Sequence, residues 1–127
     1  MAIVVAIDPQ SHLVCRTVTG AYSLDQMIAS IEATFQHPDY RPGMKELADL
    51  RECVHGATKE DIASLVEWVL GHREAATGAR AAVVVSTAVT DGMSRMAQMY
   101  LDGFPSEIAV FYDMDEAKRW LGMPTVN

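Results

Sequence analysis

The sequence predicts a single α/β domain with a mostly parallel five-stranded sheet, an initial antiparallel strand pair and about four helices. Its 127 residues suit one domain with a sizeable core. Two strand-like segments open the chain, and helix-like and strand-like segments alternate after them. Residues 81–85 form a continuous apolar run, which is typical of a central parallel strand covered on both faces.

The first two segments predict an antiparallel hairpin. Residues 2–7 form a short apolar run that ends at the turn signal Asp8-Pro9. Residues 12–19 alternate between two sets of side chains, as expected of a strand with two different faces. These sets are Leu13, Cys15 and Thr17 against Val14, Arg16 and Val18.

The first helix is predicted to begin at Ser23, which stands three residues before Gln26 in the spacing of a capping box. Its apolar stripe consists of Leu24, Met27, Ile28, Ile31 and Phe35. His37-Pro38 ends this helix, because proline forces the residue before it out of the helical region.

The middle of the chain predicts a strand and a second helix. A Pro-Gly turn at 42–43 precedes a third strand over 44–50. Thr58 is expected to begin a helix that ends at about Gly71 or Arg73. Its apolar stripe consists of Ile62, Leu65, Val66 and Val69.

The last part repeats the alternation. After the strand at 81–85, Thr90 is expected to cap a third helix that Gly103 and Pro105 end. A strand over 108–112 and a helix that starts at Asp113 complete the chain. Because crossovers between parallel strands are almost always right-handed, the last four strands should form a parallel sheet.

Three short segments carry a family resemblance. They are Val18-Thr19-Gly20 leading to Ser23, the 42–43 turn leading to Ala48-Asp49-Leu50-Arg51, and Val110-Phe111 leading to Asp115-Glu116-Ala117 and Trp120-Leu121-Gly122. With them the chain resembles the SpoIIAA-like, STAS-type domains over nearly its whole length. The resemblance implies a noncatalytic module that binds partner proteins or small, sometimes lipid-like, ligands.

The resemblance also bears on regulation. Related bacterial regulators of the anti-anti-sigma type carry a phosphorylatable serine directly after an aspartate at the end of the third strand. Here the comparable stretch is Asp49-Leu50-Arg51-Glu52, which has no hydroxyl group. The chain therefore looks closer to the STAS-like offshoot that is compared with CRAL-TRIO lipid-binding domains.

Composition narrows the classes of partner. The net charge of −7 without a basic stripe disfavours nucleic acid and anionic membrane surfaces. No apolar run approaches the roughly 20 residues of a membrane span, and the opening segment lacks the basic start of a signal peptide. With two cysteines, too few for a disulfide framework, we expect a reduced, cytoplasmic protein.

No cofactor or metal is expected from the motifs. The sequence lacks the G-x-x-x-x-G-K, G-x-G-x-x-G and G-x-S-x-G patterns of phosphate loops, dinucleotide sites and nucleophile elbows. Cys53 and His55 form a local ligand-like pair, but two ligands do not complete a tetrahedral site.

A candidate ligand site lies where the parallel strands should end, since ligands of open α/β sheets favour that edge. The residues expected there are Asp49, Arg51, Ser86, Thr87, Thr90, Tyr112 and Asp113. Arg51 offers a bidentate fork, and the hydroxyl groups with helix-start amides could hold a carboxylate or phosphate. The alternative is that these residues cap helices and pair locally.

The third helix is unusually rich in methionine. Met93, Met96 and Tyr100 fit one inward stripe, whereas Met99 falls off it. Adaptable thioether side chains could line a lipid or acyl pocket, form a homodimer face or fill the core.

These observations favour a noncatalytic binding module for a protein partner or a small apolar or anionic ligand. One alternative is an enzyme that uses Asp49, Arg51 or His55 at the strand ends. Another is a structural homo-oligomer without a ligand.

Overall fold

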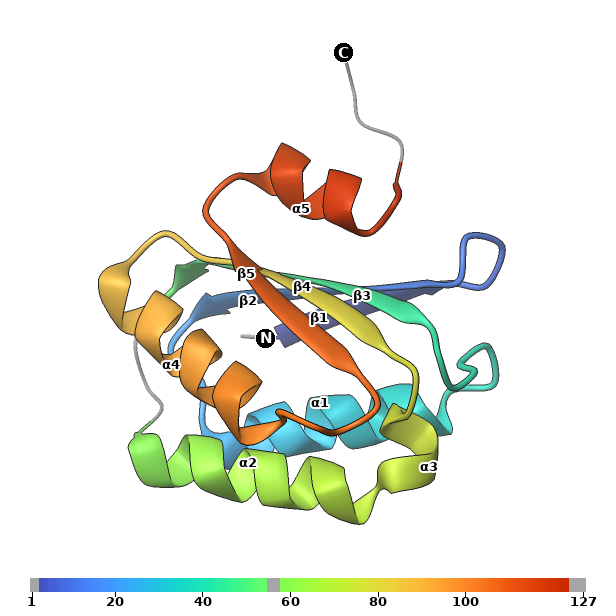
Figure 1. The fold of residues 1–127 in the computed structure, drawn as a ribbon, viewed down its shortest axis with the longest axis horizontal. Coiled ribbons are helices and arrows are strands. Elements are labelled where there is room, and N and C mark those ends of the chain that lie inside the picture. Colours follow the sequence, from blue (N-terminus) through green and yellow to red (C-terminus); the bar gives the residue numbers. More distant parts are fainter. Residues whose placement is uncertain (1–2, 55–57, 124–127) are drawn as a thin grey trace.

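A five-stranded mixed sheet forms the centre of the computed structural model, which describes residues 3–54 and 58–123 (Figure 1). The strands are β1 (Ile3–Asp8), β2 (Leu13–Gly20), β3 (Lys45–Cys53), β4 (Arg80–Val84) and β5 (Glu107–Phe111), and they lie in this order across the sheet. β1 pairs with β2 antiparallel, and all other neighbours are parallel. The predicted fold class is confirmed.

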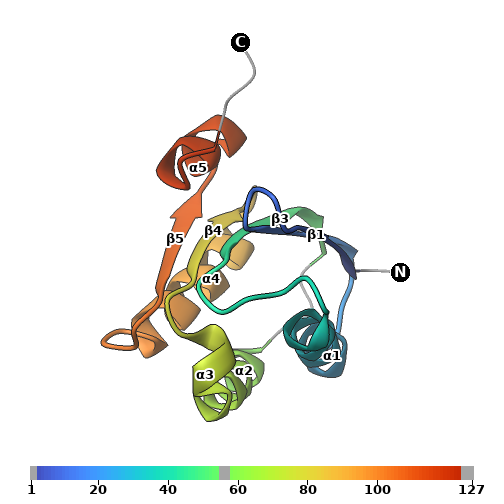
Figure 2. The same cartoon turned by 90° about the vertical axis from the view of Figure 1, so that its right-hand side faces the viewer.

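The helices divide unequally between the two faces. They are α1 (Leu24–Gln36), α2 (Lys59–Gly71), α3 (Arg73–Ala76), α4 (Ala88–Tyr100) and α5 (Met114–Trp120). α1, α2 and α4 lie against one face, and α5 alone lies against the other (Figures 1 and 2). The short helix α3 was not predicted, because it continues almost directly from α2 and adds no separate periodic pattern.

Helix starts follow the capping signals with one correction. Both Ser23 and Thr58 form complete capping boxes, as their spacing indicates. In α4, however, the cap is Thr87 and not Thr90. The Thr90 backbone N–H donates to Thr87 Oγ1 at 3.2 Å, so Thr90 lies inside the first turn. The helix therefore begins one turn earlier than predicted.

β3 extends beyond the predicted strand at 44–50. Its last residues continue the parallel pairing with β2 after a register shift between Thr17 and Thr19. Glu52 pairs with Thr19 and Cys53 with Gly20, which carries Cys53 to the far end of the sheet. The poor alternation of this segment hid the extension because a bulge interrupts the simple two-residue period.

The α5 face of the sheet is closely packed. Its core consists of Leu13, Leu47, Ala82, Val84, Ala117 and Leu121. Ala82 and Val84 of the inner strand β4 are 0 % exposed, and Leu121 is 1 % exposed. This face excludes water as the interior of a stable domain should.

The opposite face is covered less closely. Ala81 and Val83, which alternate with Ala82 and Val84 along β4, remain half-buried. Residues 81–85 were expected to be covered on both faces. This is right for the α5 face, whereas on the opposite face the strand is only partly covered. The helices are present there, but they do not fill the space above the sheet.

Candidate functional site

The candidate site is a cavity between the sheet and helices α1, α2 and α4. It has two neighbouring compartments of about 170 and 180 Å³. The compartments share the lining residues Ile31, Glu46, Leu65, Ala81, Ala97 and Ile108. Taken together they reach the lower end of the roughly 300–1,000 Å³ found for small-molecule sites. We call this pair of compartments the helix-side cavity.

Small side chains keep this cavity open. Ala48 and Ala81 lie on the sheet side, and Ala97 of α4 lies across from them. Protein interiors are normally filled to the density of an organic crystal, so a gap of this size marks missing side-chain volume. Three alanines on facing elements supply the physical reason for the gap.

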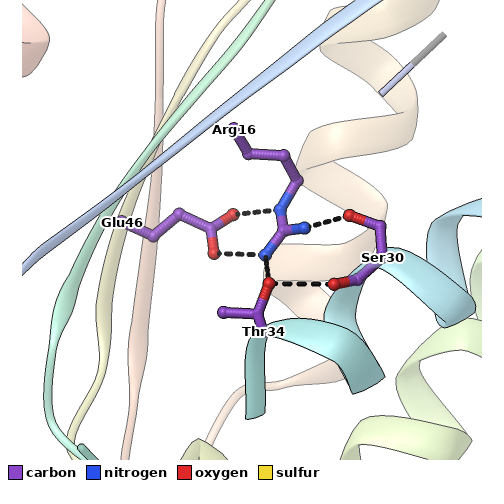
Figure 3. Close-up of polar contacts among 4 residues, drawn as sticks. All are labelled: Arg16, Ser30, Thr34 and Glu46. Atoms are coloured by element: carbon purple, nitrogen blue, oxygen red, sulfur yellow. Dashed lines mark hydrogen bonds and ion pairs between the residues drawn. The ribbon is translucent and has the colours of Figure 1, made fainter. Parts of the chain in front are cut away.

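An ion pair lies in the wall of the cavity. Arg16 of β2 donates from Nε to Oε2 of Glu46 at 3.1 Å, and from Nη2 to Oε1 at 3.1 Å (Figure 3). This bidentate arrangement is the strong form of an Arg–carboxylate contact. Alternation along β2 turns Arg16 to the same side of the sheet as Val14 and Val18, under the helices.

Helix α1 completes the surroundings of Arg16. The guanidinium Nη1 donates to Ser30 Oγ, and Nη2 donates to Thr34 Oγ1 at 3.2 Å (Figure 3). Thr34 Oγ1 in turn donates to the carbonyl oxygen of Ser30 at 2.8 Å. Arg16 is only 3 % exposed, whereas the Glu46 side chain is 27 % exposed. The carboxylate is thus the part of the network that remains open to the cavity.

A second polar group lies where β3 and α4 approach each other. Cys53 Sγ lies 4.0 Å from Thr90 Oγ1, and both residues line the 170 Å³ compartment. Burial raises the pKa of the Cys53 thiol above its ordinary value, and burial likewise raises the pKa of the nearby Tyr22 hydroxyl. Both groups are therefore neutral at pH 7, and Cys53 is poorly suited to act as a thiolate nucleophile.

Two of the predicted strand-end residues bind each other. Arg51 donates from Nε to Asp49 Oδ1 and from Nη2 to Asp49 Oδ2, both at 2.9 Å. The hydrogen bonds from Arg51 lower the pKa of the Asp49 carboxyl. The fork of Arg51 is occupied in this arrangement, and neither residue lines the helix-side cavity.

The remaining strand-end residues also make local hydrogen bonds. Ser86 Oγ donates to the carbonyl oxygen of Arg51 at 2.6 Å. Thr87 Oγ1 donates to Thr90 Oγ1 at 3.0 Å, in addition to capping α4. Tyr112 donates to Asp91 at 2.9 Å. Of these residues Thr90 is buried and lines the cavity, so the predicted edge and the cavity meet there.

The methionine-rich helix α4 turns one side toward the cavity. Met93 lines the 170 Å³ compartment, and Met96 packs in the adjoining apolar cluster of α2 and α4. Met99 is 65 % exposed, in keeping with its position off the predicted stripe. Tyr100 was predicted to face inward and is exposed, because the helix ends there and Leu101 and Phe104 are the buried residues that follow.

The metal and general-base candidates receive no structural support. His55 lies outside the described residues, so its pairing with Cys53 is not addressed. Among residues 3–54 and 58–123, no three His, Cys, Asp or Glu side chains come together in a way that could hold a metal ion.

Sequence reasoning missed Arg16 and Glu46 as site residues. The signal was present in β2, where Arg16 stands between Val14 and Val18 on an otherwise apolar strand face. A charged side chain in that position is rarely buried without a partner, so a carboxylate nearby was to be expected. Which carboxylate it would be depended on the parallel register of β2 and β3.

The fold belongs to the SpoIIAA-like class, as the resemblance in the sequence implied. A similar solved structure is that of an uncharacterised DUF3478-family protein with a SpoIIAA-like fold from Shewanella loihica PV-4. The match covers 94 % of this chain and 92 % of that protein's chain, with a TM-score of 0.61 and 20 % sequence identity. At this identity the likeness shows the fold alone.

Comparisons with protein families and with curated proteins add nothing to this fold assignment. No protein-family model matches the chain, and no curated protein matches it. In the part of the chain that the structure describes, no helix has both the length and the apolar character needed to cross a membrane.

Proposed function

We propose that this protein is a noncatalytic binding module that holds a small apolar molecule in the helix-side cavity. The observation that carries the proposal is the partial exposure of Ala81 and Val83 in the inner strand β4. Side chains of an inner strand on a face covered by three helices are normally fully buried, and here they line an open space. An apolar molecule in that space would complete the packing.

The composition of the lining supports this assignment. Most of the side chains in both compartments are apolar, and the fewer polar groups include Arg16–Glu46, Cys53–Thr90 and, at the 180 Å³ compartment, Ser106 and Glu107. This combination of an apolar wall with a few placed polar groups is typical of small-molecule sites. Met93 and the methionine-rich α4 add a wall that can adapt to an irregular ligand.

The enzyme alternative has weaker support. Its candidates Asp49 and Arg51 are bonded to each other outside the cavity. Inside it, the thiol of Cys53 is kept protonated by burial. A binding role uses the shape of the cavity directly and needs no activated group.

The test is a titration with N-phenyl-1-naphthylamine, a neutral apolar dye whose fluorescence rises when it leaves water. We expect saturable binding of one dye per chain. Ala97→Phe fills the space shared by both compartments and should weaken binding at least about tenfold, a change of roughly 1.4 kcal/mol.

The matched control is Ala63→Phe, which adds the same ring to an exposed position of α2. This variant should bind the dye as the unchanged protein does. Circular dichroism confirms that both variants are folded. Equal binding by both variants, or no saturable binding by the unchanged protein, would contradict the proposed function.

A further inference from the structure

We infer that the molecule held in the helix-side cavity is a neutral chain that carries a hydroxyl group, and that Glu46, with its charge balanced by Arg16, accepts a hydrogen bond from this group. The inference rests on the proposed function and adds the chemical class of the ligand. It is carried by the hydrogen-bonding capacity that the Arg16–Glu46 pair leaves unused.

Glu46 is the open acceptor of the cavity. It lines both compartments, and each carboxylate oxygen accepts one hydrogen bond from Arg16. A carboxylate oxygen has capacity for a second hydrogen bond. Because the side chain is partly exposed, a ligand donor can reach it.

Arg16 is nearly saturated but retains one donor. Four contacts to Glu46, Ser30 and Thr34 use the Nε–H, both Nη2 N–H groups and one of the two Nη1 N–H groups. The one N–H left over belongs to Nη1, which lies on the side of the guanidinium away from Glu46, so the pair offers a ligand acceptor capacity on Glu46 alone. The charges of the two side chains compensate each other.

A hydroxyl group matches this acceptor because it donates a hydrogen bond and carries no charge. It can donate to Glu46 without bringing a charge into the apolar cavity. A carboxylate could only accept and would lie beside the negative charge of Glu46. An ammonium could only donate and would lose its water shell on entry, which is costly.

The charges around the cavity favour the same class. Among the lining residues that the structure describes, Arg16 is the one cation, and it is already paired. Glu107 at the 180 Å³ compartment lies 3.9 Å from Arg80 Nε, so its charge is also partly balanced. An anionic ligand would thus find no unpaired cation among these lining residues, in a chain whose net charge is −7. The sequence indicates an apolar or anionic ligand, and the charges of the lining favour a neutral one.

The experiment compares three probes of equal chain length. Decanol, decanoate and decylamine are each titrated against the protein with bound N-phenyl-1-naphthylamine, and their dissociation constants are obtained from displacement of the dye. Since decanoate cannot donate to Glu46 and the decylamine ammonium must lose its water shell to enter, decanol should bind at least about tenfold more tightly than either charged probe.

The cause is tested with two double variants that preserve the net charge. Arg16→Met/Glu46→Met removes the cavity pair, and the ratio of decanol to decanoate affinity should fall several-fold. Asp49→Met/Arg51→Met removes a bidentate pair outside the cavity and should keep the ratio. Each ratio is taken within one protein, so a change in dye affinity cancels. If the cavity double variant fails to fold, Arg16→Gln/Glu46→Gln replaces it, with the same fall expected because it also removes both charges and keeps the net charge.

The outcomes separate the two claims. Decanoate or decylamine binding as tightly as decanol would overturn the inference and leave the proposed function standing. A ratio that is unchanged when the cavity pair is altered would overturn the role of Glu46 and Arg16. If the unchanged protein does not bind the dye at all, the proposed function itself fails.

Discussion

The two faces of the sheet differ in how closely their side chains are packed. On one side, the short helix α5 packs Ala117 and Leu121 onto Ala82 and Val84, and water is excluded. On the other side, three longer helices cover the same strands and still leave a cavity. The amount of helix above a face therefore does not determine how well it is packed; the sizes of the facing side chains do.

The polar groups differ in the same way. The α5 side has an apolar core, whereas the helix side contains the Arg16–Glu46 pair with Ser30 and Thr34 (Figure 3). Desolvating an ion pair offsets much of its Coulomb attraction, so such a pair is weak evidence for a role in stability. We therefore expect the pair to add little to the stability of the domain, which rests on apolar clusters of both faces, and we assign ligand recognition to the helix side.

The largest expected effect on the free energy of unfolding comes from replacing only one member of the Arg16–Glu46 pair. Glu46→Met leaves the 3 % exposed Arg16 without a counter-charge and should lower the free energy of unfolding by about 3–5 kcal/mol. Arg16→Met should cost less, because Glu46 remains partly exposed to water. Urea denaturation of each variant measures these values.

The double variant Arg16→Met/Glu46→Met is the control for this experiment. Since it removes both charges, its free energy of unfolding should return to within about 1 kcal/mol of the unchanged protein. A double variant as unstable as Glu46→Met would show that the pair is a main source of stability, against the expectation that it adds little.

Local sequence signals predicted most of the fold. Ser23 and Thr58 marked helix starts through capping boxes, and the apolar run at 81–85 marked the central strand. These features depend on neighbours within a few residues, so one sequence is enough to recognise them. The shifted start of α4 at Thr87 shows the limit of such signals, since two threonines one turn apart can both serve as caps.

The cavity could not be predicted in the same way. Ala48, Ala81 and Ala97 lie on three separate elements, and only the folded arrangement shows that they face one another. The partner of Arg16 likewise depended on strand register and on the position of α1. Arg16 alone could have been singled out, because a charge on an apolar strand face is unusual.

A smaller effect distinguishes two neighbouring residues of β4. Ala82→Val adds two methyl groups to the filled α5 face and should cost about 1–3 kcal/mol through overpacking. Ala81→Val adds the same groups to the cavity and should change the free energy of unfolding by less than about 1 kcal/mol. It should also weaken dye binding. Equal destabilisation by both substitutions would mean that the two faces are equally packed.

The smallest effect concerns the exposed pair at the strand ends. Asp49→Asn should lower the free energy of unfolding by less than about 1 kcal/mol at pH 7, since the pair with Arg51 is solvated. Because Arg51 lowers the pKa of Asp49 in the folded state, its contribution is present above the ordinary carboxyl pKa and is lost as the pH falls through the folded value.

Urea titrations of both proteins at several pH values check this dependence. The difference between Asp49→Asn and the unchanged protein should disappear at acidic pH. A difference that persists there, or one larger than that of Glu46→Met at pH 7, would reverse the expected importance of the two ion pairs.

The central claim is tested most directly by the alkylation rates of the two cysteines. Cys53 lines the helix-side cavity, whereas Cys15 packs beside the α5 core, and burial raises the pKa of both thiols. Peptide mass spectrometry follows iodoacetamide labelling with and without saturating N-phenyl-1-naphthylamine. We expect the dye to slow labelling of Cys53 at least about tenfold and to leave Cys15 nearly unchanged. Equal protection of both cysteines, or of neither, would contradict a ligand site confined to the helix side of the sheet.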